Sequence, residues 1–407
     1  MVTVRSAGLA WAAAVVAVMI RLAIAWPGLD RPPDDPDNYL PLARSIADGR
    51  GFCRPDGVPT AYRPPLYPIL LAPVTRLPET WWPATIAAIH AAIGGSTALL
   101  AASTARRWGL GRARSSAAAL IVSLDPVLVA QSRSVMTETL AALLVAGSLR
   151  VLADPEGPSR RDAGIAGFLF GLSSLCRPSL LASSGLVLAA YAGLGPGTSR
   201  HRLIRCLIAG SALVATLTPW AVRNAILLGE PVWTTTHGGY TLALANNPFY
   251  YRDVLDGPPG AVWSGPGQRA WSIDITEKTA GMGEPDADRW MAREGWRMLR
   301  ERPRDFARAS VARLGRFWGI APTAAVHGRV VSLLTAAWTA PFWLSCLAGL
   351  ASPMARRWPS AGAFAAILGL SIVHTAFWTD MRMRSPIVPA LALVASTAMA
   401  RRGAEKN

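Results

Sequence analysis

Charged residues are scarce in this chain, and nearly all of the basic ones are of one kind. Only 16% of the 407 residues are charged, against about 25% in an average soluble domain. All but two of the 41 basic residues are arginine, the exceptions being Lys278 and Lys406. With 51% hydrophobic residues and a mean hydropathy of +0.28, the composition excludes a disordered or collagen-like chain and disfavours a soluble one.

Cysteine is also rare, and no repeat is visible. The four cysteines have no metal-like spacing, so neither a disulfide-stapled secreted module nor a cysteine metal site is indicated. The net charge of +16 would suit a nucleic-acid partner, but no RNA- or DNA-binding module is present. We therefore expect no nucleic acid among the partners.

What the chain does contain is a series of apolar runs separated by short basic loops. A membrane-spanning helix needs about 20 apolar residues, and fewer inside a bundle. We predict about ten spans, at residues 7–27, 82–104, 116–132, 136–153, 163–178, 180–196, 206–227, 329–351, 360–378 and 386–400. The first run also resembles a cleavable signal peptide, but Arg21 near its end favours a retained helix.

Arginine positions predict the orientation of these spans. Clusters of arginine follow every even-numbered span, for example Arg106-Arg107, Arg160-Arg161 and Arg356-Arg357. Positive charge of this kind marks the cytoplasmic side, so both termini are predicted to be cytoplasmic. Two long segments, 28–81 and 228–328, then lie on the outer face.

The two outer segments divide the chain into three predicted units. Residues 1–227 would form a seven-span core with the first outer loop, 228–328 an outer segment, and 329–407 three further spans with a cytoplasmic tail. Residues 37–49 alternate polar and apolar positions at helical spacing, which predicts an amphipathic helix at the membrane surface. Residues 284–317 predict one or two helices broken at Pro303.

Polar residues in this apolar chain gather near the predicted outer ends of the spans. The four clusters are Asp34 to Asp37, Arg133 to Glu138, Pro219 to Asn224 and Asp380 to Arg384. Charged groups are costly near hydrocarbon, so a shared cavity would explain them together. The alternative is that each cluster only caps a helix or anchors it to lipid head groups. Acids opposite arginines suit proton removal from an acceptor hydroxyl and binding of a phosphate.

Several short motifs occur in a fixed order along the chain. The first outer loop carries Asp35-Pro36-Asp37-Asn38-Tyr39, and later Tyr62-Arg63-Pro64-Pro65. The landmarks that follow, in order, are Met136-Thr137-Glu138, Cys176-Arg177-Pro178, Pro219-Trp220 with Arg223-Asn224, Asn246-Asn247-Pro248 and Arg382-Met383-Arg384. Together these motifs resemble those of GT-C-type membrane glycosyltransferases, in particular the protein mannosyltransferase and lipid A aminoarabinose transferase group, over roughly residues 7–400.

This resemblance implies an inverting glycosyltransferase that takes a sugar from a polyprenyl-phosphate donor on the non-cytoplasmic face. A lipid, glycan or protein would be the acceptor, and a bacterial inner membrane the location. The first acid of the family corresponds best to Asp35, as general base, with Asp37 as its competitor, and the second acid to Glu138. Arg223, Arg382, Arg384 and Arg63 are the candidates for binding the donor phosphate.

Two questions stay open on the sequence alone. His237 near the outer cavity is a candidate ligand of a divalent metal, but a lone histidine is more often a hydrogen-bonding loop residue. A lipid-linked sugar transporter or flippase, or an oligosaccharide ligase, is the alternative function. Transporters usually have ionisable residues at the midplane and repeated halves, and this chain has neither, which favours the transferase.

Overall fold

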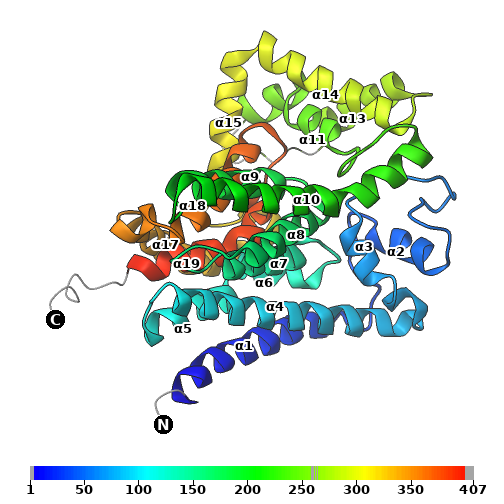
Figure 1. Cartoon of the computed structure of the whole chain (residues 1–407). Coiled ribbons are helices and arrows are strands. Elements are labelled where there is room, and N and C mark those ends of the chain that lie inside the picture. The colour runs from blue at the N-terminus through cyan, green and yellow to red at the C-terminus, as the bar shows by residue number, and fades with distance from the viewer. Residues whose placement is uncertain (1–3, 258–260, 262, 264, 399–407) are drawn as a thin grey trace.

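The computed structural model describes residues 4–257, 261, 263 and 265–398 as a helical molecule (Figure 1). Within these residues there is no β-strand, and only two isolated bridges occur, Asp34 with Ser134 and Cys53 with Pro59. The expected all-α architecture is therefore confirmed for the described chain.

A helix lies within each predicted span. These helices are α1 (Val4–Ala25), α4 (Trp82–Arg107), α5 (Arg112–Leu124), α6 (Pro126–Ala130), α7 (Glu138–Val151), α8 (Arg160–Cys176), α9 (Leu180–Leu194), α10 (Ser199–Leu228), α17 (Arg329–Leu350), α18 (Ser360–Ala376) and α19 (Val388–Ala398). Short helices η4 (Gln131–Arg133), η6 (Pro353–Arg356) and η7 (Met381–Ile387) connect some of them.

Not all of these helices are long enough to cross a membrane unaided. Among the described residues, four segments combine the required length and hydropathy: Gly8–Gly28, Glu79–Arg107, Ser199–Leu228 and Arg329–Leu350. A fifth is possible if α5 and α6, which meet at an angle of 42°, form one broken span. The chain is an integral membrane protein, whereas the number ten remains a prediction.

Close helix packing depends on small residues. A Cβ added at Gly167 of α8 would lie 2.1 Å from the carbonyl oxygen of Ala209 in α10, so these two backbones touch. Gly369 of α18 likewise meets the backbone of Ser183 in α9. Small residues at such crossings are typical of helix pairs in membranes, where van der Waals contact replaces the hydrophobic effect.

The charged residue of the first span is accommodated by backbone carbonyls. Arg21 is buried, and its guanidinium donates to the carbonyl oxygens of Ala17, Val122 and Ser123. The last two lie at the C-terminal end of α5, where the chain bends before Pro126. Arg21 therefore fastens α1 to the end of α5.

The segment predicted to form the first outer loop contains short helices: η1 (Trp26–Gly28), α2 (Tyr39–Ala47), α3 (Leu66–Leu71), η2 (Val74–Arg76) and η3 (Glu79–Trp81). The helix predicted over 37–49 exists, but it begins at Tyr39 rather than at Asp37. Asn38 adopts the left-handed conformation with φ of 57°, which prevents the helix from extending toward the N-terminus.

The second outer segment is a helical unit with its own hydrophobic cluster. It comprises α11 (Gly238–Ala245), α12 (Pro248–Tyr250), the π-helix η5 (Tyr251–Leu255), α13 (Pro266–Thr279), α14 (Glu284–Glu301), α15 (Pro303–Phe317) and α16 (Ala324–His327). The predicted break at Pro303 is confirmed. Aromatic residues such as Tyr250, Trp263 and Trp271 form the cluster, and Trp378 from the end of α18 packs against it.

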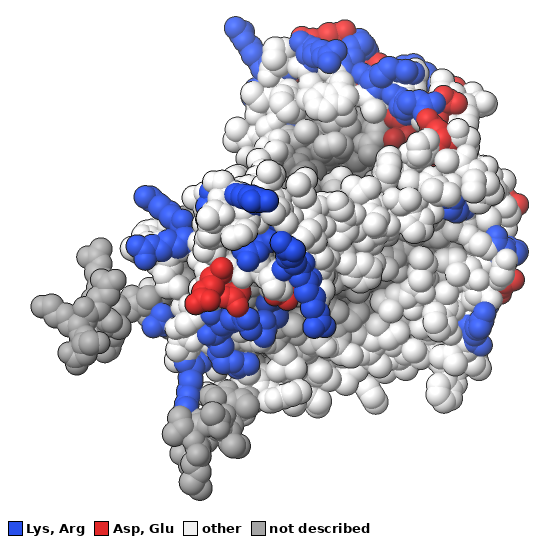
Figure 2. Space-filling view, in the orientation of Figure 1, with Lys and Arg blue, Asp and Glu red and all other residues white. Residues whose placement is uncertain are grey.

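The arrangement separates charged from uncharged surface. In Figure 1, α1 and α4 lie side by side at the bottom, α10 runs above them, and α13 to α15 form a group at the top. Figure 2 shows charged side chains gathered over this upper group, at the lower left and, in smaller number, along the right edge. The surface between them, over α4 and α10, is almost free of charge, as expected for contact with lipid.

Candidate active site

The turn before α2 brings the first acidic cluster against the second. The Asp34 carboxylate accepts a hydrogen bond from the Ser134 hydroxyl at 2.6 Å, and the Val135 amide donates to the Asp34 carbonyl oxygen at 2.7 Å. Two of the four clusters predicted to share a cavity, Asp34 to Asp37 and Arg133 to Glu138, are therefore neighbours.

Asp35 holds the start of α2. Its two carboxylate oxygens accept from the backbone amides of Tyr39 and Leu40, at 2.9 and 2.7 Å. The sequence favoured Asp35 as the general base, with Asp37 as its competitor; in the structure both carboxylate oxygens of Asp35 cap α2. The left-handed Asn38 turns the chain so that Asp35 faces the free amides. Burial raises the pKa of Asp35, and these amide hydrogen bonds partly oppose the rise.

Asp37 and Arg63 form an ion pair that lines a cavity. Its carboxylate lies 2.9 Å from Nη2 of Arg63, and Nε of Arg63 donates to the Asp37 carbonyl oxygen at 3.1 Å. Both side chains are about a fifth exposed, 23% for Asp37 and 18% for Arg63. The Arg63 guanidinium also lies over the rings of Tyr39 and Tyr62, which limits its movement.

Two cavities meet at this ion pair, because Asp37, Tyr62 and Arg63 line both. The inner cavity, of about 790 Å³, extends from them to the loops after α8 and α18. The outer cavity, of about 930 Å³, lies between the first loop, the end of α10 and the start of α14. Asp37 is thus reachable from two sides.

Arginines line the inner cavity. Arg177 follows α8, pairs with Glu138 at 3.0 Å and donates to the Thr137 hydroxyl at 3.1 Å. Arg382 lies in η7, where its Nε is 3.2 Å from the Asp380 carboxylate. Glu138 itself has no exposed side-chain surface, and of this pair Arg177 is the residue that lines the cavity.

His237 lies at the cavity wall among aromatic rings. Its ring stacks on Tyr240, meets Tyr62 edge-on, and has its Nε2 3.4 Å from Arg63. Burial, with the Arg63 charge beside it, lowers the pKa of His237 to about 3. The imidazole is therefore neutral at physiological pH.

The surroundings of His237 do not suit a divalent cation. The described residues contain no group of three or more His, Cys, Asp or Glu side chains close enough to hold a metal. The charged neighbour of the imidazole is an arginine rather than a carboxylate. The residues present therefore do not fit the metal that the sequence left open.

Arg223 and Arg384 lie outside both cavities. Arg223 donates to the carbonyl oxygens of Thr60 and Phe52 and stacks on Trp220, which fastens the first loop to α10. Arg384 is buried, donates to the carbonyl oxygens of Phe317 and Gly319 and lies over Trp343. Their predicted contact with a donor phosphate remains a prediction.

Comparison with solved structures places this architecture in a known class. The oligosaccharyltransferase of Archaeoglobus fulgidus, tethered with an acceptor peptide containing the NVT sequon, superposes with a TM-score of 0.56 at 14% identity. The match covers 97% of this chain and 49% of the oligosaccharyltransferase. The apo form of the same enzyme superposes with a TM-score of 0.56 at 16% identity, over 97% of this chain and 50% of the oligosaccharyltransferase. The fold is that of GT-C-type glycosyltransferases.

The chain spans about half the length of these oligosaccharyltransferases, so the GT-C-type fold is what they have in common with it. ArnT from Cupriavidus metallidurans in the apo state gives a TM-score of 0.42 at 15% identity, over 94% of this chain and 77% of ArnT. No protein-family model and no curated protein sequence matches the chain.

Two features of the inner cavity could not be predicted from the sequence. Arg177 stood within a recognised motif, Cys176-Arg177-Pro178, but only its ion pair with Glu138, 39 positions earlier, gives it a place in the wall. The aromatic group of Tyr62, His237 and Tyr240 unites the first outer loop with the second segment. Neither contact could be inferred from spacing along the chain.

Proposed function

We propose that this protein is an inverting glycosyltransferase that transfers a sugar from a polyprenyl-phosphate donor to an acceptor hydroxyl or amide at the non-cytoplasmic membrane face. The GT-C-type fold supports the reaction class. The observation that carries the proposal is the Asp37–Arg63 pair, which lies where two large cavities meet. Transfer between two bulky molecules needs such a meeting point.

The reaction fits this geometry. The acceptor atom attacks C1 of the sugar, the bond from C1 to the phosphate oxygen breaks, and the acceptor proton passes to a carboxylate. The released polyprenyl phosphate carries the electron pair of the broken bond as negative charge. Guanidinium groups beside it would stabilise that charge as it develops.

The inner cavity suits the donor. Arg177 and Arg382 line it and offer paired N–H groups to a phosphate. An apolar groove of about 770 Å³ runs along α18, lined by residues such as Trp343, Leu347 and Phe364. We assign the polyprenyl chain to this groove, because a long hydrocarbon chain needs an apolar surface and the groove ends on α18 at Ser371, two positions before Val373 of the inner cavity.

The outer cavity suits the acceptor. One of its walls is the start of α14, including Glu284, whose carboxylate accepts from the hydroxyls of Thr60 and Thr236. These bonds join the second outer segment, 228–328, to the first loop. We therefore propose that this segment determines which acceptor reaches Asp37.

We propose Asp37 as the base and Asp35 as the residue that orients it, which reverses the order favoured by the sequence. Asp37 lines both cavities, whereas both oxygens of Asp35 are engaged by backbone amides. A base must be within hydrogen-bond reach of the acceptor proton, and Asp37 meets that condition better.

The matched pair Asp37→Asn and Asp35→Asn separates the two roles. Synthetic polyprenyl-phosphate sugars would be incubated with purified enzyme and a membrane extract as acceptor, and released polyprenyl phosphate measured. Asp37→Asn should lower turnover by about 10² to 10⁴ with unchanged thermal stability. Asp35→Asn should chiefly lower the unfolding temperature, because one amide hydrogen bond at α2 is lost.

The opposite pattern, an inactive but stable Asp35→Asn enzyme, would return the base role to Asp35. Movement of intact donor across vesicles without cleavage, unaffected by Asp37→Asn, would instead identify a flippase and overturn the proposed reaction.

A further inference from the structure

A separate pocket lies on the opposite side of the Asp34–Ser134 contact from the inner cavity. It has a volume of about 420 Å³ and is formed by the end of α1, the start of α4 and the residues around η4. Asp34 and Val135 line this pocket, whereas Asp37 and Met136 line the inner cavity, and no residue lines both. The proposed reaction gives this pocket no role.

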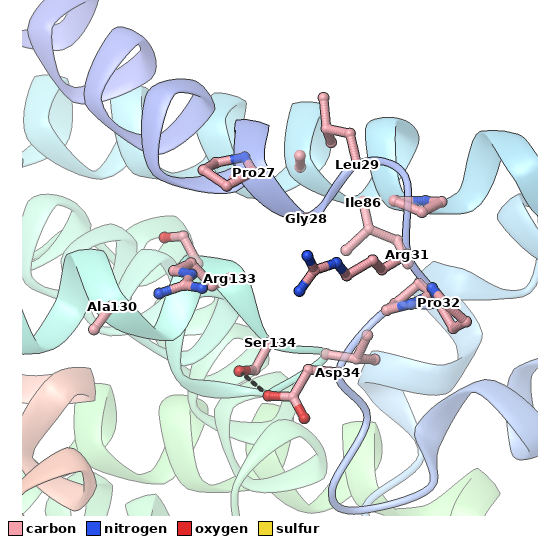
Figure 3. Close-up of a pocket in the computed structure, with 16 residues that line it drawn as sticks. Pro27, Gly28, Leu29, Arg31, Pro32, Asp34, Ile86, Ala130, Arg133 and Ser134 are labelled. Carbon is pink, nitrogen blue, oxygen red and sulfur yellow. Dashed lines mark hydrogen bonds between the residues drawn. The ribbon is translucent and has the colours of Figure 1, made fainter. Parts of the chain in front are cut away.

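Two arginines from distant parts of the chain enter it. Figure 3 shows Arg31 extending across the pocket toward the side from which Arg133 comes, above the hydrogen bond between Asp34 and Ser134. Arg133 has no carboxylate partner among the residues that the structure describes, and Arg31 has only a solvent-exposed pair with Asp30 at 3.9 Å. Such an exposed pair stabilises little.

A buried hydroxyl in the same wall also lacks a partner. Ser132 is 3% exposed, and its Oγ makes no hydrogen bond in the described structure. A buried polar atom without a partner costs free energy unless a ligand satisfies it. Two guanidinium groups and a hydroxyl donor together indicate a ligand with several anionic oxygens.

The pocket lies at the depth of lipid head groups. Its walls include Gly28 and Pro83, close to the ends of the spans Gly8–Gly28 and Glu79–Arg107. Trp26 and Trp81 beside it are 74% and 61% exposed, as is usual for tryptophan at the membrane interface.

The adjoining surface is suited to acyl chains. Leu22, Met19 and Val15 on α1 are exposed and continue away from the pocket along that helix. An apolar stripe that leads from two arginines at head-group depth matches a phospholipid better than a free anion, because both parts of the lipid would be in contact.

We infer that this pocket binds the phosphate of an anionic phospholipid, with Arg31, Arg133 and Ser132 as donors and the lipid chains along α1. The site is independent of the proposed transfer reaction. It would fix the end of α1, and with it the turn that carries Asp34 to Asp37, against the membrane surface.

Native mass spectrometry of the full chain with phosphatidylglycerol or phosphatidylcholine tests this inference. Arg31→Gln and Arg133→Gln should each weaken phosphatidylglycerol binding roughly fivefold, and the double variant more. The control Arg269→Gln/Arg304→Gln removes the same charge from exposed positions on α13 and α15 and should leave binding unchanged. Arg133→Lys, which keeps the charge, guards against misfolding and should retain most binding.

Three results would overturn the inference. The double variant could bind phosphatidylglycerol as well as the wild type does. Inorganic phosphate could occupy the pocket as tightly as the lipid, which would identify a free-anion site. The double variant could lose binding of polyprenyl phosphate in parallel, which would make the pocket part of the donor site.

Discussion

Arginine side chains in this protein differ mainly in what satisfies their guanidinium groups. Arg21, Arg223 and Arg384 donate to backbone carbonyl oxygens and fasten one segment to another. Arg63 and Arg177 instead pair with carboxylates at a cavity wall. Of these five, Arg63 and Arg177 line the inner cavity, whereas Arg21, Arg223 and Arg384 do not.

The Glu138–Arg177 pair should be costly to break from one side. Arg177→Met would leave the fully buried Glu138 carboxylate without its partner, and we expect a loss of about 3–5 kcal/mol. Glu138→Gln should cost less, because a neutral amide remains. The double variant Glu138→Leu/Arg177→Met should recover much of the loss, since no buried charge is left unpaired.

Tryptophan-fluorescence unfolding in detergent would measure these differences. Equal stability of Arg177→Met and wild type would show that water or lipid compensates the carboxylate.

His237 should make stability depend on pH. Its pKa is about 3 in the folded protein against 6.5 ordinarily, so only the unfolded chain takes up a proton in between. Stability is therefore highest above pH 6.5 and falls as pH decreases toward 3, by at most about 1.4 kcal/mol per pH unit. The unfolding temperature should drop less between pH 7 and pH 5 in His237→Gln, and an identical drop would contradict the assignment.

At the scale of elements, α11 and α14 are held at backbone contact by one glycine. A Cβ at Gly239 would lie 2.0 Å from the carbonyl oxygen of Asp288, while the Gly239 amide donates to the Asp288 carboxylate at 2.7 Å. The neighbouring Gly238 has no atom within 4 Å of such a Cβ. The two glycines thus provide a test and its control at adjacent positions.

Gly239→Ala should destabilise the protein by roughly 1–3 kcal/mol, because the helices must separate. The change would also displace His237 and Tyr240, so binding in the inner cavity should weaken. Gly238→Ala should affect neither, as measured by thermal unfolding and polyprenyl-phosphate binding. Similar effects of both substitutions would mean that helix propensity rather than close packing is responsible.

At the scale of the whole molecule, the orientation predicted from arginine can be tested at two exposed positions. Asp56 lies in the first outer loop, and Glu156 in the turn between α7 and α8. In a variant without the four native cysteines, Asp56→Cys should react with an impermeant reagent on intact cells, and Glu156→Cys only after permeabilisation. The reverse pattern would invert the orientation and move the proposed site to the cytoplasm.

The helical class, the approximate positions of the apolar helices and the break at Pro303 could be predicted from the sequence. These features depend on local hydropathy and on backbone preferences that neighbouring residues set. The sequence also indicated that four polar clusters share one cavity, and two of them, Asp34 to Asp37 and Arg133 to Glu138, are joined by the Asp34–Ser134 contact.

The directions of the charged side chains in these clusters, by contrast, depend on contacts between distant segments of the fold. The left-handed turn at Asn38 directs Asp35 toward the amides of α2, while Asp37 lines the cavities. Glu138 forms an ion pair with Arg177, which follows α8. Arg223 and Arg384 met carbonyl oxygens instead. An arginine side chain is long enough to reach several different partners. The direction of its guanidinium group therefore depends on which distant group the fold brings within hydrogen-bond distance.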